Sequence, residues 1–206
     1  MNDTHNNSNQ QASKSEMREW MKTRRDAVPG QQRAIWSQHI VERAIGLPGY
    51  HSAQTVHVFL SIQSEVDTQR LIEHALAHGK RVVLPVFLRN SIETPCTQIT
   101  SLADEDYKLT GFGLRVPKVK QLVPVAEVDW VWVPLLAFWP VRSSNAGMAA
   151  NSPAHRLGYG AGFYDRFLAQ IQAPKVGLAF EMQRVNGWPI EPHDVPLDFV
   201  VTEGNR

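Results

Sequence analysis

The amino-acid sequence predicts an α/β fold with an open, mainly parallel sheet. Short runs rich in β-branched and aromatic residues alternate along the chain with segments of helical periodicity. The clearest unit joins an apolar run at 55–60, an amphipathic helix at 68–78 and a second apolar run at 81–86. A strand–helix–strand connection of this kind nearly always crosses over right-handed into parallel pairing. Its repetition along the chain predicts helices packed against one parallel sheet.

The residues before this unit predict a leader and two helices. The first 13 residues are rich in Asn, Gln and Ser and lack an apolar run, so they predict a disordered leader and no signal peptide. The apolar spacing of Lys14–Ile45 is helical, and Pro29-Gly30 divides it so that a second helix is expected from Gln31. A single domain over residues 14–206 is the natural interpretation, since one α/β domain of this size is ordinary.

The second half of the chain predicts further strands and one more helix. Buried strands are expected at Asp129–Leu136, Lys175–Phe180 and Phe199–Val201. The two tryptophans of the first of these could face opposite sides of the sheet. A helix is expected from about Tyr164 to about Ile171.

Two stretches of the chain have a less regular pattern. Residues 97–101 and 107–110 fit either short antiparallel strands or loop. Residues 141–154 are rich in Ser, Asn, Gly and Ala, and they predict a mobile insertion.

The composition excludes several functional classes. A hydrophobic content of 43% supports a sizeable core, and no apolar stretch reaches the length of a membrane span. A formal net charge of +1, from 21 basic and 20 acidic residues, gives no general attraction for nucleic acid or membrane surfaces. The only cysteine, Cys96, excludes a disulfide framework and a cysteine-based zinc site. We expect a soluble, cytoplasmic protein that binds neither nucleic acid nor membranes and is a monomer.

The glycine-rich segment Arg156–Arg166, RLGYGAGFYDR, carries the strongest functional signal. Glycines at alternate positions permit positive φ, and successive backbone N–H groups can then face one anion. A helix beginning at its end, and the guanidinium groups of Arg156 and Arg166, also suit phosphate. The segment is neither a Walker A loop nor a GxGxxG fingerprint. A tight turn packed by aromatic side chains is the alternative, but the flanking charged residues favour binding of ATP phosphates.

Five motifs follow one another along the chain in a fixed order. They are KSEMR at Lys14–Arg18, FLS followed by EVDT at Phe59–Thr68, GKRVVLP at Gly79–Pro85, the glycine-rich segment, and HDVPLDFVVTE at His193–Glu203. Together they resemble the 5-formyltetrahydrofolate cyclo-ligase family, also called methenyltetrahydrofolate synthetase. The resemblance covers nearly all of the chain after the leader. It implies a three-layer α/β sandwich like that of ribose-phosphate isomerases and CoA-transferases.

The resemblance also implies a reaction and its cofactors. The family converts 5-formyltetrahydrofolate to 5,10-methenyltetrahydrofolate with ATP as co-substrate and Mg²⁺ as the metal, and it releases ADP and phosphate. The formyl oxygen attacks the γ-phosphate, and N10 of the folate then closes the ring as phosphate departs. The protein therefore has to align two ligands and neutralise phosphate charge.

Site residues follow from the resemblance, position by position. The catalytic residues are expected to be Arg156, Tyr164 and Lys14. Contacts with ATP are expected from Lys14, Arg18, Arg156, Leu157, Gly158, Tyr159, Gly160, Ala161, Gly162, Phe163 and Tyr164. Substrate contacts are expected from Leu60, Glu65, Tyr159 and Phe163. Magnesium ligands are expected to be Asp165 and Asp194.

Several of these residues have a simpler structural interpretation. Lys14 and Arg18 lie four residues apart and share one helix face, which could reach a triphosphate or be merely solvated. Arg24 and Arg25 are predicted to be solvated. Glu65 could accept hydrogen bonds from the N–H groups of a pterin ring or cap the following helix, a role that Asp67-Thr68 fits better. Asp198 could equally be structural, capping the final strand, and none of the eight histidines is expected to take part in the chemistry.

Two other functions remain open at this level. Leu114 stands where the family often has an aromatic residue. Either Phe112 compensates for that residue, or the pocket accepts a different ligand, as in a related enzyme that uses ATP on another small amide or carboxylate. A nucleotide-binding module without catalysis is the other alternative. The pairing of Asp165 with Asp194 argues against that module, because a sensor has no need to arrange a metal ion for phosphoryl transfer.

Overall fold

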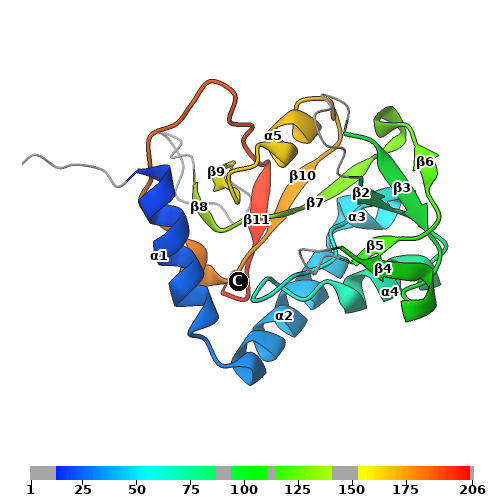
Figure 1. Ribbon diagram of the computed structural model, residues 1–206, viewed down its shortest axis with the longest axis horizontal. Coiled ribbons are helices and arrows are strands. Elements are labelled where there is room, and N and C mark those ends of the chain that lie inside the picture. Colours follow the sequence, from blue (N-terminus) through cyan, green and yellow to red (C-terminus); the bar gives the residue numbers. More distant parts are fainter. Residues whose placement is uncertain (1–12, 87–93, 111–114, 141–152, 205–206) are drawn as a thin grey trace, which may run out of the picture.

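A seven-stranded sheet forms the centre of the protein (Figure 1) in the computed structural model, which describes residues 13–86, 94–110, 115–140 and 153–204. The strand order is β11-β10-β7-β1-β2-β3-β6. Its strands are β1 (Thr55–His57), β2 (Arg81–Pro85), β3 (Cys96–Ile99), β6 (Gln121–Val123), β7 (Trp130–Pro134), β10 (Lys175–Leu178) and β11 (Phe199–Val201). The strands from β11 to β2 pair in parallel, whereas β3 and β6 pair antiparallel at one edge. The predicted open, mainly parallel sheet is confirmed.

Helices cover both faces of this sheet and complete the three layers. On one face, α2 (Gly30–Ile45), α3 (Pro48–Ser52) and α4 (Gln69–Ala77) enclose an apolar core. On the other face, α5 (Phe163–Leu168) packs its Phe163 and Phe167 against a second core. Alternate strand residues enter opposite cores, as Val82 and Val83 of β2 do.

The predicted placement of the two tryptophans on opposite faces is wrong. Trp130 and Trp132 both belong to the core beneath α2 and α4, with ring centroids 5.4 Å apart. The reason is the two-residue period of a strand, which sends side chains at i and i+2 to the same face. Tyr50 of α3 packs against both rings.

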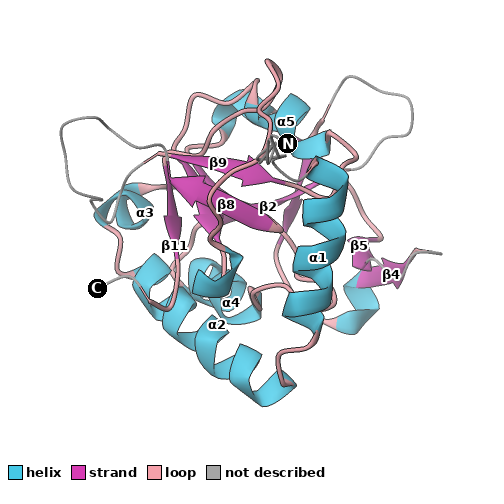
Figure 2. Ribbon diagram, turned by 90° about the vertical axis from the view of Figure 1, so that its left-hand side faces the viewer, coloured by secondary structure: helices cyan, strands magenta, loops and turns pink. Residues whose placement is uncertain are grey.

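Helix α1 (Lys14–Asp26) lies across one end of the sheet, against the hairpin formed by β8 (Ala137–Pro140) and β9 (Ala154–Leu157) (Figure 2). A small core of buried side chains fixes this contact: Met21, Ala137, Leu157 and Trp188. Ser13 begins the helix with a capping box in which its hydroxyl and the Glu16 carboxylate exchange hydrogen bonds with backbone N–H groups. Nε of Arg18 donates to the Gly158 carbonyl just after β9, so the start of α1 lies beside the end of that strand.

Several element boundaries differ from those predicted. The first strand ends at His57 and not at residue 60, and the chain continues as a loop in which the Phe59 carbonyl accepts from the Thr68 hydroxyl at 2.7 Å. Helix α5 ends at Leu168, short of Ile171. Of the two alternatives at 97–101 and 107–110, the antiparallel strands are the correct ones. They are β3 and also β4 (Tyr107–Leu109), which pairs with β5 (Arg115–Pro117).

Some predictions fall outside the described residues. These concern the leader up to residue 12, the insertion from 141 to 152, and the positions of Phe112 and Leu114. Among the helices that the structure does describe, none combines the length and the apolar character needed to cross a membrane.

Candidate active site

A pocket of about 850 Å³ opens at the carboxyl ends of the parallel strands. Its walls include the loop after β1, the end of β2 at Leu84-Pro85 and the end of β7 at Pro134. The first turns of α1 and the loop after β9 close it from the other side. In parallel α/β sheets this edge is where ligands generally bind. Every residue that the resemblance assigned to the site lines this pocket, whereas Arg166, also expected to suit phosphate, is exposed and does not line it.

Three glycines of the loop after β9 each lie against an arginine. A Cβ at Gly158 would meet Nη1 of Arg156 at 2.5 Å, and one at Gly160 would meet the Arg18 guanidinium at 3.4 Å. Gly160 and Gly162 also have positive φ, at 99° and 64°. The Nε of Arg18 donates to the Gly158 carbonyl at 2.9 Å. A Cβ at Gly162 would meet Nη1 of Arg166 at 3.0 Å. The absence of side chains therefore lets three guanidinium groups approach the loop backbone closely.

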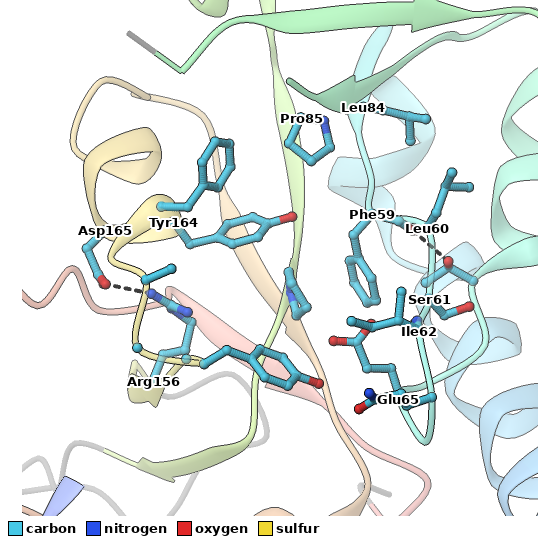
Figure 3. A pocket seen from close by; sticks show the side chains of 18 of the residues that line it. Phe59, Leu60, Ser61, Ile62, Glu65, Leu84, Pro85, Arg156, Tyr164 and Asp165 are labelled. Atoms are coloured by element: carbon cyan, nitrogen blue, oxygen red, sulfur yellow. Dashed lines mark hydrogen bonds and ion pairs between the residues drawn. The ribbon is translucent and has the colours of Figure 1, made fainter. Parts of the chain in front are cut away.

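Arg156 and Asp165 form an ion pair across the base of this loop. Nη2 of Arg156 donates to Oδ1 of Asp165 at 2.6 Å, and the arginine side chain is only 3% exposed. Figure 3 shows this pair and Tyr164 on one side of the pocket, with Glu65 on the other. Among the described residues, Nε of Arg156 has no hydrogen-bond partner. A buried polar atom without a partner is costly, so this nitrogen is available to a bound ligand.

The Tyr164 hydroxyl is a second buried polar group without a partner among the described residues. It projects into the space between the two walls (Figure 3). Burial raises the pKa of this phenol well above its usual value; the nearby Glu65 adds to the rise and Arg156 opposes it. Tyr164 is therefore a neutral hydroxyl that can donate a hydrogen bond inside the pocket.

The ammonium group of Lys14 lies between two carboxylates at the rim. Nζ is 2.5 Å from Glu191 and 2.6 Å from Asp194. Burial disfavours the ammonium, but its hydrogen bonds with Asp194 and Glu191 outweigh this and raise the pKa of Lys14. Ligand atoms of Glu191, His193 and Asp194 lie within 4.8 Å of one another. Oxygen donors from carboxylates suit Mg²⁺, but in this structure a lysine neutralises them.

The two predicted magnesium ligands are not neighbours in one carboxylate group. Asp165 is bound to Arg156, whereas Asp194 belongs to the cluster with Glu191 and His193. Both line the same pocket, and each already has a cationic partner. Asp198 lies apart from them and is structural, since its carboxylate accepts from the Lys175 N–H at the start of β10 at 2.6 Å.

Glu65 lies on the opposite wall and does not cap α4. Its Oε2 accepts from the Ile62 N–H at 3.0 Å, whereas Asp67 accepts from the Gln69 N–H at the helix start. The pKa of Glu65 is raised overall, because burial raises it more than its neighbours lower it. Those neighbours are the Ile62 N–H, the Tyr159 hydroxyl and the Arg25 cation. A partly buried carboxylate facing a pocket lined by Leu60 suits a ligand with adjacent N–H groups.

The predicted exposure of Arg25 is wrong. Its side chain is 1% exposed, and it donates to the Tyr159 hydroxyl at 2.7 Å and to the Ser64 hydroxyl at 2.9 Å. Its neighbour Arg24 is exposed and stacks on Trp20. The signal in the sequence is the four-residue spacing from Met21, which puts Arg25 on the buried face of α1.

Other pocket-lining residues carried no sequence signal of their own. They come from the loop after β1, from the β4–β5 hairpin and from the segment before β11: Ile62, Gln63, Leu109, Arg115, Val116, Pro117 and Glu191. Short irregular segments have no periodicity that would assign them to a pocket.

The profile of the 5-formyltetrahydrofolate cyclo-ligase family matches residues 10–203. The chain belongs to this family. Among cyclo-ligase relatives, a 5-formyltetrahydrofolate cyclo-ligase of Escherichia coli K12 is 34% identical over 187 residues, covering 88% of this chain and 96% of the relative. A probable cyclo-ligase of Caenorhabditis elegans is 28% identical over 200 residues, covering 93% of each chain.

Two solved structures named as 5,10-methenyltetrahydrofolate synthetases share the fold. The 5,10-methenyltetrahydrofolate synthetase of Aquifex aeolicus superposes with a TM-score of 0.75 and 28% identity, over 93% of this chain and 90% of that one. A synthetase from Mycoplasma pneumoniae, 21% identical, has the same fold with a TM-score of 0.71. The resemblance read from the five motifs is therefore confirmed for family and fold class.

Proposed function

We propose that this cyclo-ligase family member uses ATP to convert 5-formyltetrahydrofolate to 5,10-methenyltetrahydrofolate, with release of ADP and phosphate. One observation carries the proposal. A single pocket joins a wall with Lys14, Arg18 and Arg156 around a glycine loop to a wall with Glu65 and apolar side chains. The first wall suits a triphosphate, and the second suits a flat ring with N–H donors.

The cationic wall would hold ATP. Arg18 and Arg156 lie against the backbone of the glycine loop, and Lys14 reaches the same pocket from the start of α1. Positive charge at this wall stabilises the charge that develops on the transferred γ-phosphoryl group. Leu157, Tyr159, Ala161 and Phe163 complete the surface that we assign to the nucleotide and the adjoining substrate.

The opposite wall would hold the folate. Glu65 is proposed to accept hydrogen bonds from adjacent N–H groups of the pterin, and Leu60 to pack against the ring. Tyr164 lies between the walls, and its hydroxyl, which has no partner in the part of the chain that the structure describes, can donate to an oxygen at the reacting centre. The formyl oxygen then attacks the γ-phosphorus as ADP leaves, and N10 attacks the formyl carbon as phosphate leaves. The catalytic residues in this proposal are Arg156, Tyr164 and Lys14.

Magnesium fits the site as a companion of the triphosphate. Asp194 and Asp165 are the carboxylates proposed to hold it, and the oxygen donors of Glu191 lie beside Asp194. The ion would supply charge neutralisation for the phosphates. Because Lys14 neutralises Asp194 in this structure, we propose that the ammonium moves toward the phosphates when the ion binds.

We also propose that the protein acts as a monomer in the cytoplasm. Cys96 is a buried free thiol whose pKa burial raises to about 12, and it needs no oxidising compartment. Sedimentation of the purified protein tests the first proposal, and fractionation of cells tests the second.

The function is tested by following the near-ultraviolet absorbance of methenyltetrahydrofolate. Purified protein is mixed with 5-formyltetrahydrofolate and Mg-ATP, with a control that omits ATP. The proposal requires a rise that depends on ATP, with one ADP released for each product formed. Folded protein that binds ATP but gives no rise would refute the assigned substrate, and the search would then turn to other small amides and carboxylates.

A further inference from the structure

The guanidinium group of Arg25 joins three segments that are distant in the sequence. It extends from α1 and is 1% exposed. Nε donates to the Ser64 hydroxyl at 2.9 Å, Nη2 to the Tyr159 hydroxyl at 2.7 Å and Nη1 to the Leu135 carbonyl at 3.5 Å. A buried cation is tolerated only when such partners surround it. Arg25 therefore ties the loop after β1 and the glycine loop to one helix.

These partners are the immediate neighbours of the pocket-lining groups. Ser64 precedes Glu65 in the chain, and its hydroxyl in turn donates to Asp26. Tyr159 lies in the glycine loop and lines the pocket, and its hydroxyl acts on Glu65 by lowering the pKa of that carboxyl. Arg25 itself does not line the pocket. Any effect of Arg25 on a bound ligand must therefore pass through Glu65 and Tyr159.

The charge of Arg25 also acts on Glu65. Burial raises the pKa of Glu65, and the Arg25 cation opposes that rise. The titratable groups that face Glu65 from neighbouring elements are Arg25 of α1, Tyr159 of the glycine loop and Tyr164 of α5. Arg25 is the cation of this group, so it is the residue that favours the carboxylate over the acid.

We propose that Arg25 is a positioning residue, which holds Glu65 and Tyr159 in the arrangement in which Glu65 accepts hydrogen bonds from the substrate. The proposal deepens the proposed function and rests on it for the identity of the substrate. A lysine cannot replace this arginine fully, because the planar fork reaches separate acceptors in different directions at once. The adjacent Arg24 offers a matched control, since it is the same residue type on the same helix but is exposed and stacks on Trp20.

The first experiment measures Glu65 directly and needs no enzymatic activity. Protein labelled with ¹³C at the glutamate carboxyl groups is titrated by NMR, and Glu65→Gln identifies the resonance. Arg25→Met is expected to move the midpoint of the Glu65 titration to higher pH, and Arg25→Lys to move that midpoint less. Arg24→Met is expected to leave it unchanged. An unmoved midpoint in folded Arg25→Met, or an equal shift in Arg24→Met, overturns the proposal.

The second experiment measures kinetics with both substrates. Arg25→Met is expected to raise KM for 5-formyltetrahydrofolate about tenfold, by analogy with loss of a charged hydrogen bond, and to change KM for ATP less than about twofold. The acid limb of kcat/KM for the folate should move to higher pH, with partial recovery in Arg25→Lys. A merely structural role would lower both affinities together and leave the pH profile in place, and that result overturns the proposal.

Failure of the proposed function can be told apart from failure of this inference. If wild-type protein makes no methenyl product, the proposed function fails, whereas the NMR titration still decides the role of Arg25. If Arg25→Met does not fold, Ser64→Ala removes one acceptor of the guanidinium and Tyr159→Phe removes another. Each is expected to shift the Glu65 midpoint, and a midpoint that stays in place in both overturns the proposal.

Discussion

The ammonium group of Lys14 lies 2.6 Å from a carboxylate oxygen of Asp194, a residue 180 positions further along the chain. Both side chains are 14% exposed. The pair links the first turn of α1 to the segment before β11 at the rim of the pocket. The hydrogen bonds from Lys14 lower the pKa of Asp194 against the effect of burial. The group proposed to bind phosphate and a group proposed to bind metal thus hold each other in this structure.

Replacement of Lys14 by Met should weaken ATP binding about tenfold or more, because one cation is lost from the phosphate wall. The measurement is the rise in melting temperature with added Mg-ATP, which reports affinity for the folded state. Lys22→Met provides the control, since Lys22 of the same helix lies outside the pocket. An equal rise in melting temperature with Mg-ATP in the Lys14 variant and in wild type would remove Lys14 from the site.

Replacement of Arg156 by Ala, or of Asp165 by Asn, should lower turnover by about 100-fold or more while the protein stays folded. Arg156 supplies charge to the pocket, and Asp165 fixes its guanidinium at 2.6 Å. Turnover is measured by the methenyltetrahydrofolate absorbance and folding by circular dichroism. Arg166→Ala is the control, because Arg166 is exposed and does not line the pocket. A folded variant with the wild-type rate would contradict the assigned role.

Replacement of Tyr164 by Phe should lower activity and leave stability unchanged or raise it by about 1 kcal/mol. The hydroxyl is buried without a partner among the described residues, so its removal eliminates a desolvation cost. Tyr50→Phe should instead lower stability and leave activity unchanged. The Tyr50 hydroxyl forms a hydrogen bond with Nδ1 of His74 at 3.0 Å, and Tyr50 does not line the pocket. Thermal unfolding and turnover of both variants check the pair. Destabilisation by Tyr164→Phe would indicate that its hydroxyl has a structural role.

Replacement of His57 by Met should make the free energy of unfolding fall less steeply as the pH is lowered. His57 is fully buried against Phe167, and burial lowers its pKa from 6.5 to about 3. Between these values the unfolded chain binds one more proton than the folded protein. The stability that this neutral histidine contributes is therefore complete above about pH 6.5 and is lost as the pH falls toward 3.

The contribution of His57 to the slope of the free energy of unfolding against pH should reach about 1.4 kcal/mol per pH unit. Urea unfolding at several pH values measures it in wild type, in His57→Met and in the control His39→Gln, which changes an exposed histidine. The control should keep the wild-type slope. An unchanged slope in His57→Met would show that His57 is protonated in the folded protein or titrates alike in both states.

Local patterns in the sequence determined much of the site. The four-residue spacing of Lys14 and Arg18 put both on one face of α1, and both line the pocket. The alternate glycines of the RLGYGAGFYDR segment marked a loop that two arginines approach closely. The strand–helix–strand pattern placed Glu65 after a strand end, which is the binding edge of a parallel sheet. Each of these depends only on residues close together in the chain.

Tertiary structure alone decided the partners of these residues. Arg24 and Arg25 are identical neighbours in the sequence, yet only Arg25 meets Tyr159 and Ser64, because the helix turns it toward the interior. The pairing of Lys14 with Asp194 likewise depends on the docking of α1 against the β8–β9 hairpin. Periodicity records which face of an element is buried, but charge pairing over 180 residues depends on how whole elements pack together.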